Sequence, residues 1–122
     1  MTYDIYMDFI LEHYKNPSNY GKIENPSTSS KGLNPLCGDE LEIYILVEKN
    51  TIKDIKFTGK GCAISQASAS ILTEMVKGKD IDYVKNLKEK DLLDALGIEI
   101  SPSRLKCALL SYNTLKEAVS KL

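Results

Sequence analysis

The centre of the fold is predicted by residues 41–59, which read LEIYILVEKNTIKDIKFTG. Apolar side chains alternate with more polar ones on both sides of a Lys49-Asn50 pair, a pattern typical of two β-strands joined as a hairpin. Cys37 lies just before the first strand and Cys62 just after the second. Because antiparallel pairing brings these two strand ends to the same edge of a sheet, we expect the two cysteines to be neighbours. The alternating apolar residues are Leu41, Ile43, Ile45 and Val47 in the first strand, and Ile52, Ile55 and Phe57 in the second.

Helical patterns flank the hairpin on both sides. Gly78 and Gly97 follow apolar periodic segments, at positions where glycine commonly ends a helix. Residues 25–34 are rich in Ser, Thr, Asn, Pro and Gly, and they form the one extended stretch predicted to be irregular, a kind of loop that is often functional or mobile. The first expected helix begins after Thr2 and ends at Asn16-Pro17, and the next begins at Ser65 and ends near Lys77. Two short helices are expected at residues 80–87 and 91–96, and the last helix begins at Ser101.

The last predicted helix is long and has the clearest amphipathic pattern. Ser101 is its expected N-cap and Pro102 its first residue. At about 100° per residue, Cys107 falls roughly 130° from the centre of the apolar stripe. We therefore do not expect Cys107 to be a core residue. The stripe consists of Leu105, Ala108, Leu109, Tyr112, Leu115, Val119 and Leu122.

The composition predicts one domain, spanning residues 1–122, in a reducing compartment. Of its 122 residues, 43% are hydrophobic, which is enough to bury a core without disulfides. Three cysteines are an odd number, so we expect no closed disulfide framework and thiols that are free for reactivity or metal binding. No secretory leader or membrane-spanning run is recognisable, and scattered lysines with a net charge of −1 argue against nucleic acid as a partner. We expect a cytoplasmic protein that binds neither nucleic acid nor membrane.

Three thiols gathered in one site are typical of a soft-metal centre. Thiolates select zinc, copper(I) or iron–sulfur clusters, and such centres normally take four ligands. Asp39 is the nearest candidate for the fourth, because a Cys37-Gly38-Asp39 turn can direct both side chains into one site; the alternative for Asp39 is a turn cap. His13, the only histidine, is predicted to pack on the apolar face of the first helix rather than to coordinate. Lys106 is charged and has no free lone pair, so its role is electrostatic or that of a solvated side chain.

Four short motifs run in order along essentially the whole chain. They are Glu12-His13-Tyr14-Lys15-Asn16-Pro17, Asn34-Pro35-Leu36-Cys37-Gly38-Asp39, Gly59-Lys60-Gly61-Cys62-Ala63-Ile64-Ser65 with Ala67-Ser68-Ala69-Ser70, and Arg104-Leu105-Lys106-Cys107-Ala108. Each motif alone is weak, but the four in this order are highly specific. Together they resemble the U-type iron–sulfur cluster assembly scaffolds, the family that contains IscU, SufU and the N-terminal domain of NifU.

The resemblance implies an α+β fold, in which helices cover one side of a small antiparallel sheet and a cluster or metal site lies at one exposed end. It implies that Cys37, Cys62 and Cys107 are ligands and sulfur acceptors, with Asp39 as a weaker fourth ligand. The implied function is that of a scaffold rather than an enzyme. A cysteine desulfurase dependent on pyridoxal phosphate would pass sulfur to Cys107 or Cys37, a [2Fe–2S] cluster would form with iron, and an apo-protein would receive it. Such a cluster is either bound by one chain or bridged between copies in a homodimer or larger homo-oligomer.

Two features depart from IscU. Lys106 stands where a histidine usually precedes the third cysteine, and residues 99–103 replace a segment that docks an Hsp70-type chaperone. The resemblance therefore does not extend to histidine ligation or to chaperone-driven release. The sequence before Cys107 is closer to SufU, although the longer insertion typical of SufU is absent.

This likeness to SufU leaves a second function open, that of a zinc-dependent sulfurtransferase. In that function, zinc orders the site until the desulfurase displaces one ligand. In either function, Arg104 and Lys106 are expected to attract anionic persulfide or cluster charge to the site. The zinc ligands would be the same four residues, Cys37, Asp39, Cys62 and Cys107.

Overall fold

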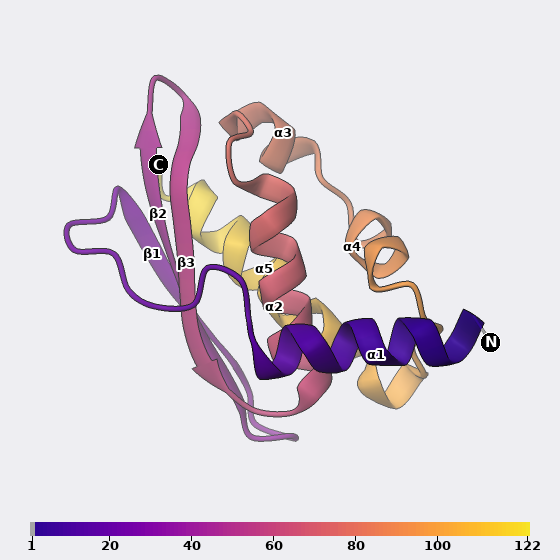
Figure 1. The fold of residues 1–122 in the computed structure, drawn as a ribbon. Helices are drawn as coiled ribbons and strands as arrows, with labels where there is room; N and C mark the ends of the chain where they lie inside the picture. The colour runs from indigo at the N-terminus through magenta and orange to yellow at the C-terminus, as the bar shows by residue number, and fades with distance from the viewer. Residues whose placement is uncertain (1) are drawn as a thin grey trace.

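The helices lie on one face of a three-stranded antiparallel sheet, whose strands run in the order β1-β2-β3 (Figure 1). The computed structural model describes the backbone of residues 2–122 and the side chains of residues 7–122. This architecture confirms the predicted α+β fold. The elements are α1 (Thr2–Lys15), β1 (Thr28–Asn34), β2 (Asp39–Glu48), β3 (Thr51–Lys60), α2 (Ala63–Val76), α3 (Ile81–Asn86), α4 (Glu89–Leu96), the 3-10 turn η1 (Pro102–Arg104) and α5 (Leu105–Ser120).

The predicted hairpin forms the centre and one edge of the sheet. β2 and β3 pair up to Glu48 and Thr51, which flank the turn. Lys49 and Asn50 both have positive φ, 53° and 61°, as a two-residue type I′ turn requires. The alternation of apolar residues is therefore a true strand signal, and it buries the hairpin against the helices. The buried apolar side chains of the hairpin are Leu41, Ile43, Tyr44, Ile45, Ile52, Ile55 and Phe57.

The prediction of an irregular stretch at residues 25–34 is wrong for most of its length. Strand β1 occupies Thr28–Asn34 and pairs antiparallel with β2. Its small residues allow α5 to approach closely, since a Cβ at Gly32 would overlap the Thr114 side chain. The Thr28 hydroxyl also donates to the Ala118 carbonyl at 2.8 Å. Pairing with β2 and packing against α5 thus impose a strand on a loop-like composition.

Helix α2 begins earlier than predicted. Cys62, not Ser65, is its N-cap residue, and the Ser65 hydroxyl instead donates to the Cys62 carbonyl at 3.2 Å. The predicted helix ends are confirmed, because Gly78 follows α2 with a φ of 84° and Gly97 caps α4 with a φ of 74°. The expectation that Thr2 caps α1 concerns a side chain outside the described residues, whereas α1 does end before Asn16, as predicted.

Helix α5 corrects the prediction for Cys107, whose side chain is only 1% exposed. The helix contacts β1 and β2 on one side and α2 on another, so its buried surface is wider than the apolar stripe. The Leu110 and Thr114 side chains, which lie outside the stripe, face Gly32 of β1. Leu105, at the edge of the predicted stripe, is 38% exposed. The buried residues outside the stripe are Cys107, Leu110, Ser111, Thr114 and Ala118.

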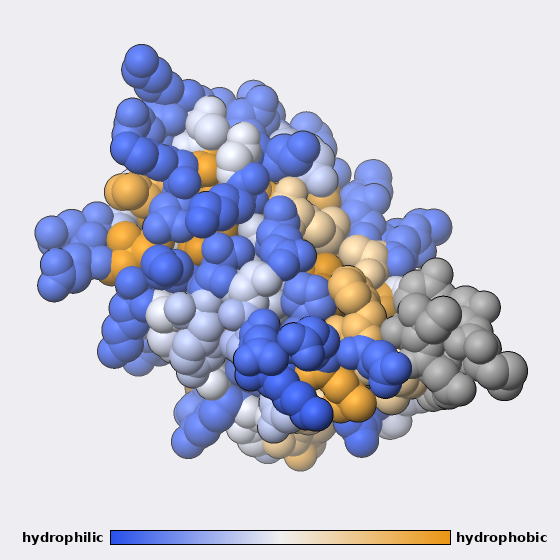
Figure 2. Space-filling view, in the orientation of Figure 1, coloured by the Kyte–Doolittle hydropathy of each residue, from blue (hydrophilic) through white to orange (hydrophobic). Residues whose placement is uncertain are grey.

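The hydrophobic core lies between the sheet and the helices. Hydrophilic side chains cover most of the face seen in Figure 2. None of the helices within residues 2–122 is both long and apolar enough to cross a membrane. The largest fully buried side chains are Phe57, Ile10, Leu41, Ile43, Ile45, Ile52, Ile55, Leu72, Leu92, Leu96, Leu115 and Val76.

Candidate metal centre

Three segments bring the cysteines together at one end of the sheet. Cys37 lies in the turn between β1 and β2, Cys62 lies between β3 and α2, and Cys107 lies in the first turn of α5. The Cys107 thiol donates to Cys37 Sγ at 3.4 Å. Within the described part of the chain, the ligand atoms of Cys37, Asp39 and Cys107 all lie within 4.8 Å of one another. Of the four predicted ligands, the structure places Cys37, Asp39 and Cys107 in this group, and Cys62 lies outside it.

Asp39 connects Cys62 to this group. Its side chain is 1% exposed, Oδ1 accepts the Cys62 N–H at 2.9 Å, and Oδ2 lies 3.9 Å from Cys62 Sγ. Gly61 has a φ of 147°, and a Cβ at this position would overlap Asp39 Oδ1. Glycine is therefore required here for the backbone to pass the carboxylate. This bond holds Cys62, the N-cap residue of α2, next to Asp39.

The three thiols differ in their access to solvent. Cys37 is exposed, Cys62 is half-buried and Cys107 is buried. Burial raises the pKa of the Cys107 thiol well above its ordinary value, and the neighbouring Cys37, Asp39 and Cys62 raise it further. Without a metal, Cys107 therefore keeps its proton, which a bound metal must displace.

Sequence reasoning overlooked a contact of Asn34. Its side-chain amide donates to Cys107 Sγ at 3.7 Å from the end of β1, and its side chain is buried. Hydrogen bonds from such neighbours orient the ligand atoms of metal sites. Its position in the motif with Cys37 was the only sequence signal that could have indicated this contact.

The donor set suits a soft metal or an iron–sulfur cluster. Two thiols and one carboxylate lie close together, and the third thiol, of Cys62, lies 3.9 Å from that carboxylate. A tetrahedral soft-metal centre takes four such donors. The carboxylate is the hard donor of the set, and it already accepts a backbone hydrogen bond.

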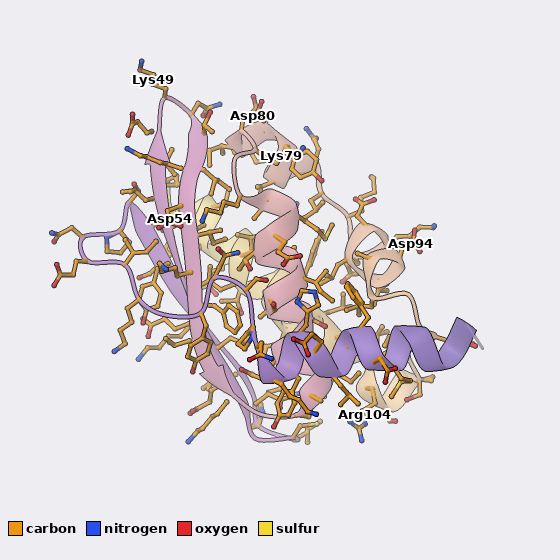
Figure 3. All side chains as sticks on the ribbon, in the orientation of Figure 1. Lys49, Asp54, Lys79, Asp80, Asp94 and Arg104 are labelled. Carbon is orange, nitrogen blue, oxygen red and sulfur yellow. The ribbon has the colours of Figure 1, made fainter. Side chains whose placement is uncertain are left out.

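Arg104 and Lys106 are exposed beside this site, in η1 and at the start of α5. Figure 3 shows the Arg104 side chain pointing outwards at the end of the molecule where the β1–β2 turn also lies. Within residues 7–122, neither side chain forms an ion pair. Their charges are therefore available to an anionic partner. In the part of the chain whose side chains are described, neither residue forms a hydrogen bond with a thiol.

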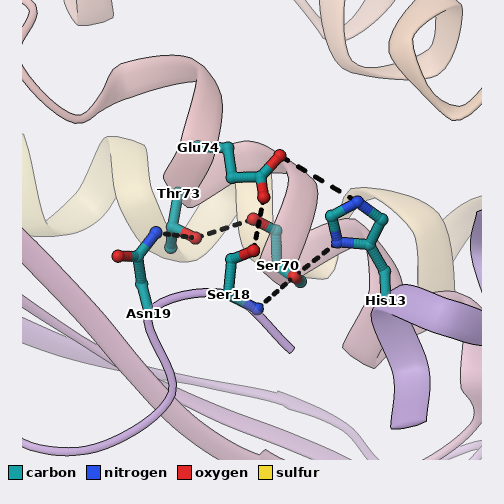
Figure 4. Close-up of polar contacts among 6 residues, drawn as sticks. All are labelled: His13, Ser18, Asn19, Ser70, Thr73 and Glu74. Carbon is teal, nitrogen blue, oxygen red and sulfur yellow. Dashed lines mark hydrogen bonds and ion pairs between the residues drawn. The ribbon is translucent and has the colours of Figure 1, made fainter. Parts of the chain in front are cut away.

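The only histidine belongs to a different polar cluster, which joins α1 to α2 (Figure 4). His13 Nδ1 lies 2.7 Å from Ser70 Oγ, which also accepts the Ser18 N–H at 2.7 Å. His13 Nε2 lies 3.9 Å from a Glu74 carboxylate oxygen, whose partner oxygen accepts the Ser18 hydroxyl. His13 thus packs with protein partners, as expected, and is not a member of the thiol site.

Comparison with known proteins gives both sequence and structural relatives. A family model described as NifU-like N terminal domain matches residues 5–122. The zinc-dependent sulfurtransferase SufU of Bacillus subtilis (strain 168) is 35% identical, over 96% of this chain and 90% of the relative. The iron-sulfur cluster assembly scaffold protein IscU 1 of Archaeoglobus fulgidus is 38% identical, over 94% of this chain and 74% of the relative.

Solved structures extend this similarity to the fold. The crystal structure of FiSufU, a candidate iron–sulfur cluster assembly scaffold for the SUF system of Fervidobacterium islandicum AW-1, superposes with a TM-score of 0.80. It is 34% identical, and the match covers 98% of this chain and 99% of that chain. The similarity therefore includes every element that carries a cysteine of the site.

Proposed function

Because the chain belongs to the family of NifU-like N-terminal domains, we propose that it is a scaffold on which an iron–sulfur cluster is assembled and from which it is transferred. One observation carries the proposal: two thiols and a buried carboxylate have their ligand atoms within 4.8 Å, and that carboxylate also binds the backbone of the third cysteine. Relatives named as IscU scaffold proteins support it.

The exposures of the thiols suggest an order of events. Cys37 is the exposed thiol and is thus the first acceptor of sulfur from the persulfide of a cysteine desulfurase. Cys107 is buried behind it and serves as a ligand rather than as the point of entry. Iron held by the thiolates and Asp39 meets this sulfur, and an external electron donor supplies two electrons that reduce each persulfide to sulfide and a thiolate. Two such sulfides and two irons form a [2Fe–2S] cluster as cargo.

The carboxylate of Asp39 provides the point at which release of the cluster begins. A carboxylate binds iron less strongly than a thiolate in a soft site, so the thiolate of an apo-acceptor can first replace Asp39. The partners are therefore a desulfurase and apo-proteins that need a cluster, and both meet the end of the molecule that carries Cys37. Three free thiols on such a scaffold require a reducing compartment.

A second candidate function, that of a zinc-dependent sulfurtransferase, has its own support. SufU of Bacillus subtilis has that name, and the donor set of this chain also suits zinc. Zinc would be held by Cys37, Asp39, Cys62 and Cys107, where it keeps the bound thiols deprotonated. Exposed Cys37 is then the ligand that leaves most easily to accept sulfur.

Anaerobic purification followed by metal and acid-labile sulfide analysis distinguishes the two functions. For a scaffold, incubation with ferrous iron, cysteine and a desulfurase yields iron and sulfide on the protein, with visible charge-transfer absorption. For a sulfurtransferase, the protein contains one zinc per chain and stimulates the desulfurase without retaining sulfide. A protein that binds neither iron with sulfide nor zinc would contradict both functions.

A further inference from the structure

Two of the three thiols form a direct sulfur–sulfur contact. The Cys107 thiol donates to Cys37 Sγ at 3.4 Å, so one exposed and one buried sulfur face each other without an intervening group. Cys62 is placed differently, because its Sγ lies 3.9 Å from Asp39 Oδ2 and its N–H is bound to the same carboxylate. The structure thus singles out one pair among the three cysteines.

The exposed member of this pair is on a segment that can move. A disulfide requires a sulfur–sulfur distance of about 2.05 Å, so the sulfurs must approach by roughly 1.4 Å. Cys37 lies in the β1–β2 turn and is followed by Gly38, which has a φ of 71° and open space around its Cβ position. Its backbone N–H bonds only to the Asn34 carbonyl, at 3.2 Å. The turn can therefore carry Cys37 towards Cys107, which α5 holds in place.

We propose that Cys37 and Cys107 are a dithiol–disulfide pair, which a low-molecular-weight disulfide oxidises when no metal holds the two sulfurs. The Cys37 thiolate attacks the small disulfide, forms a mixed disulfide and expels one thiolate. The Cys107 thiol then passes its proton to the Asp39 carboxylate, whose ligand oxygen lies within 4.8 Å of the Cys107 sulfur, as that sulfur attacks Cys37 Sγ. The second small thiolate leaves and takes up the same proton. Two protein thiols are oxidised, and one small disulfide is reduced to two thiols.

Closure of this disulfide would block the metal site. It occupies two of the four predicted donors and leaves only Asp39 and Cys62, which cannot hold a soft metal in a four-ligand site. A bound metal in turn protects the pair, because coordinated sulfurs are not free to attack. The inference requires neither iron nor a desulfurase, so it stands or fails separately from the proposed function.

The test uses the full chain, made metal-free with a chelator and incubated anaerobically with oxidised glutathione. We expect the intact mass to fall by two hydrogen atoms, and peptide mapping to find a Cys37–Cys107 disulfide with Cys62 still open to alkylation. The oxidised protein should bind no zinc until a dithiol reduces it. A stable glutathione adduct on wild-type Cys37, or a disulfide that contains Cys62, would overturn the proposal.

Matched variants separate entry from closure. Cys62→Ser should still form the disulfide, whereas Cys107→Ser should stop at the glutathione adduct on Cys37. Protein loaded with zinc should react at least tenfold more slowly than metal-free protein, because coordination removes the free thiolates. Equal rates of oxidation with and without zinc would contradict the claim that the metal and the disulfide compete for the same two sulfurs. Circular dichroism confirms that each variant is folded before it is compared.

Discussion

The chain contains two polar clusters that differ in how their polar atoms are satisfied. In the cluster of His13, Ser18, Ser70 and Glu74, each side chain has protein partners, and the buried groups satisfy one another (Figure 4). In the thiol cluster, the recorded contacts are long and weak, at 3.4 to 3.9 Å between a sulfur and its partner. Sulfur atoms held only by such contacts are available to a ligand, whereas the hydrogen bonds of the His13 cluster stabilise the fold.

The largest expected effect is loss of the cluster when a thiol is replaced. Each of Cys37→Ser, Cys62→Ser and Cys107→Ser should remove or strongly weaken the charge-transfer absorption that forms with ferrous iron, cysteine and a desulfurase, because a hydroxyl is a poor ligand for a soft metal. His13→Ala is the matched change in the satisfied cluster and should leave the absorption intact. Undiminished cluster yield in all three cysteine variants would exclude a shared site.

The satisfied cluster should instead affect stability. Ser70→Ala removes the buried hydroxyl that contacts His13 and accepts the Ser18 N–H, so we expect a loss of about 1–3 kcal/mol in the free energy of unfolding. Urea denaturation of the metal-free protein measures it, with the exposed Ser120→Ala as control. Iron and sulfide content should match the wild-type protein. A cluster defect with unchanged stability would reverse the roles of the two regions.

Asp39 shares features of both clusters, since it accepts a backbone hydrogen bond and also lies among the thiols. Asp39→Asn keeps an acceptor for the Cys62 N–H but removes the carboxylate. We expect a cluster to form and to pass to an apo-ferredoxin about tenfold more slowly, with the thermal stability of the metal-free protein nearly unchanged.

Asp39→Ala completes this test, because it also removes the acceptor of the backbone bond. It should slow transfer similarly and in addition cost about 1 kcal/mol of stability. Wild-type transfer rates in both variants, together with a lower melting temperature for the alanine variant alone, would leave Asp39 as a cap and exclude it as a ligand.

The raised pKa of the Cys107 thiol should make the free energy of unfolding depend on pH. Burial raises the pKa of Cys107 above its ordinary value of 9.0, so the folded state retains a proton that the unfolded chain gives up. The stabilisation is complete below pH 9.0 and is progressively lost as the pH rises above it. Urea denaturation of metal-free protein across this range should give a steeper decline for wild type than for Cys107→Ala. Equal slopes would contradict the buried, protonated thiol.

The smallest expected effect concerns the exposed charges beside the thiols. Reversing Arg104 and Lys106 to Glu should slow sulfur transfer from the desulfurase and make the remaining rate less sensitive to salt. The control reverses Lys49 and Lys79, which lie at the opposite end of the molecule in Figure 3 and change the net charge equally. Equal transfer kinetics in the two double variants would reduce Arg104 and Lys106 to ordinary surface charges.

Local signals predicted the elements that short-range chemistry controls. The hairpin followed from side chains that alternate around Lys49-Asn50, and the ends of α2 and α4 followed from Gly78 and Gly97, because positive φ favours glycine. Strand β1 was missed for the opposite reason. Apart from Thr28, its small and polar residues, such as Gly32 and Asn34, do not favour a strand. The strand exists because β2 offers hydrogen bonds and α5 needs a close surface at Gly32.

For the site, the sequence by itself predicted the candidate donors and placed Cys37 and Cys62 at one edge of the sheet, because the hairpin brings both of its ends there. Only the tertiary structure decided that these donors are unequal. Cys107 is buried because α5 packs on the sheet and on α2 at once, and Cys37 is exposed because its turn extends beyond that contact. Periodicity in one helix reports a single buried face, whereas burial depends on every element that packs against it.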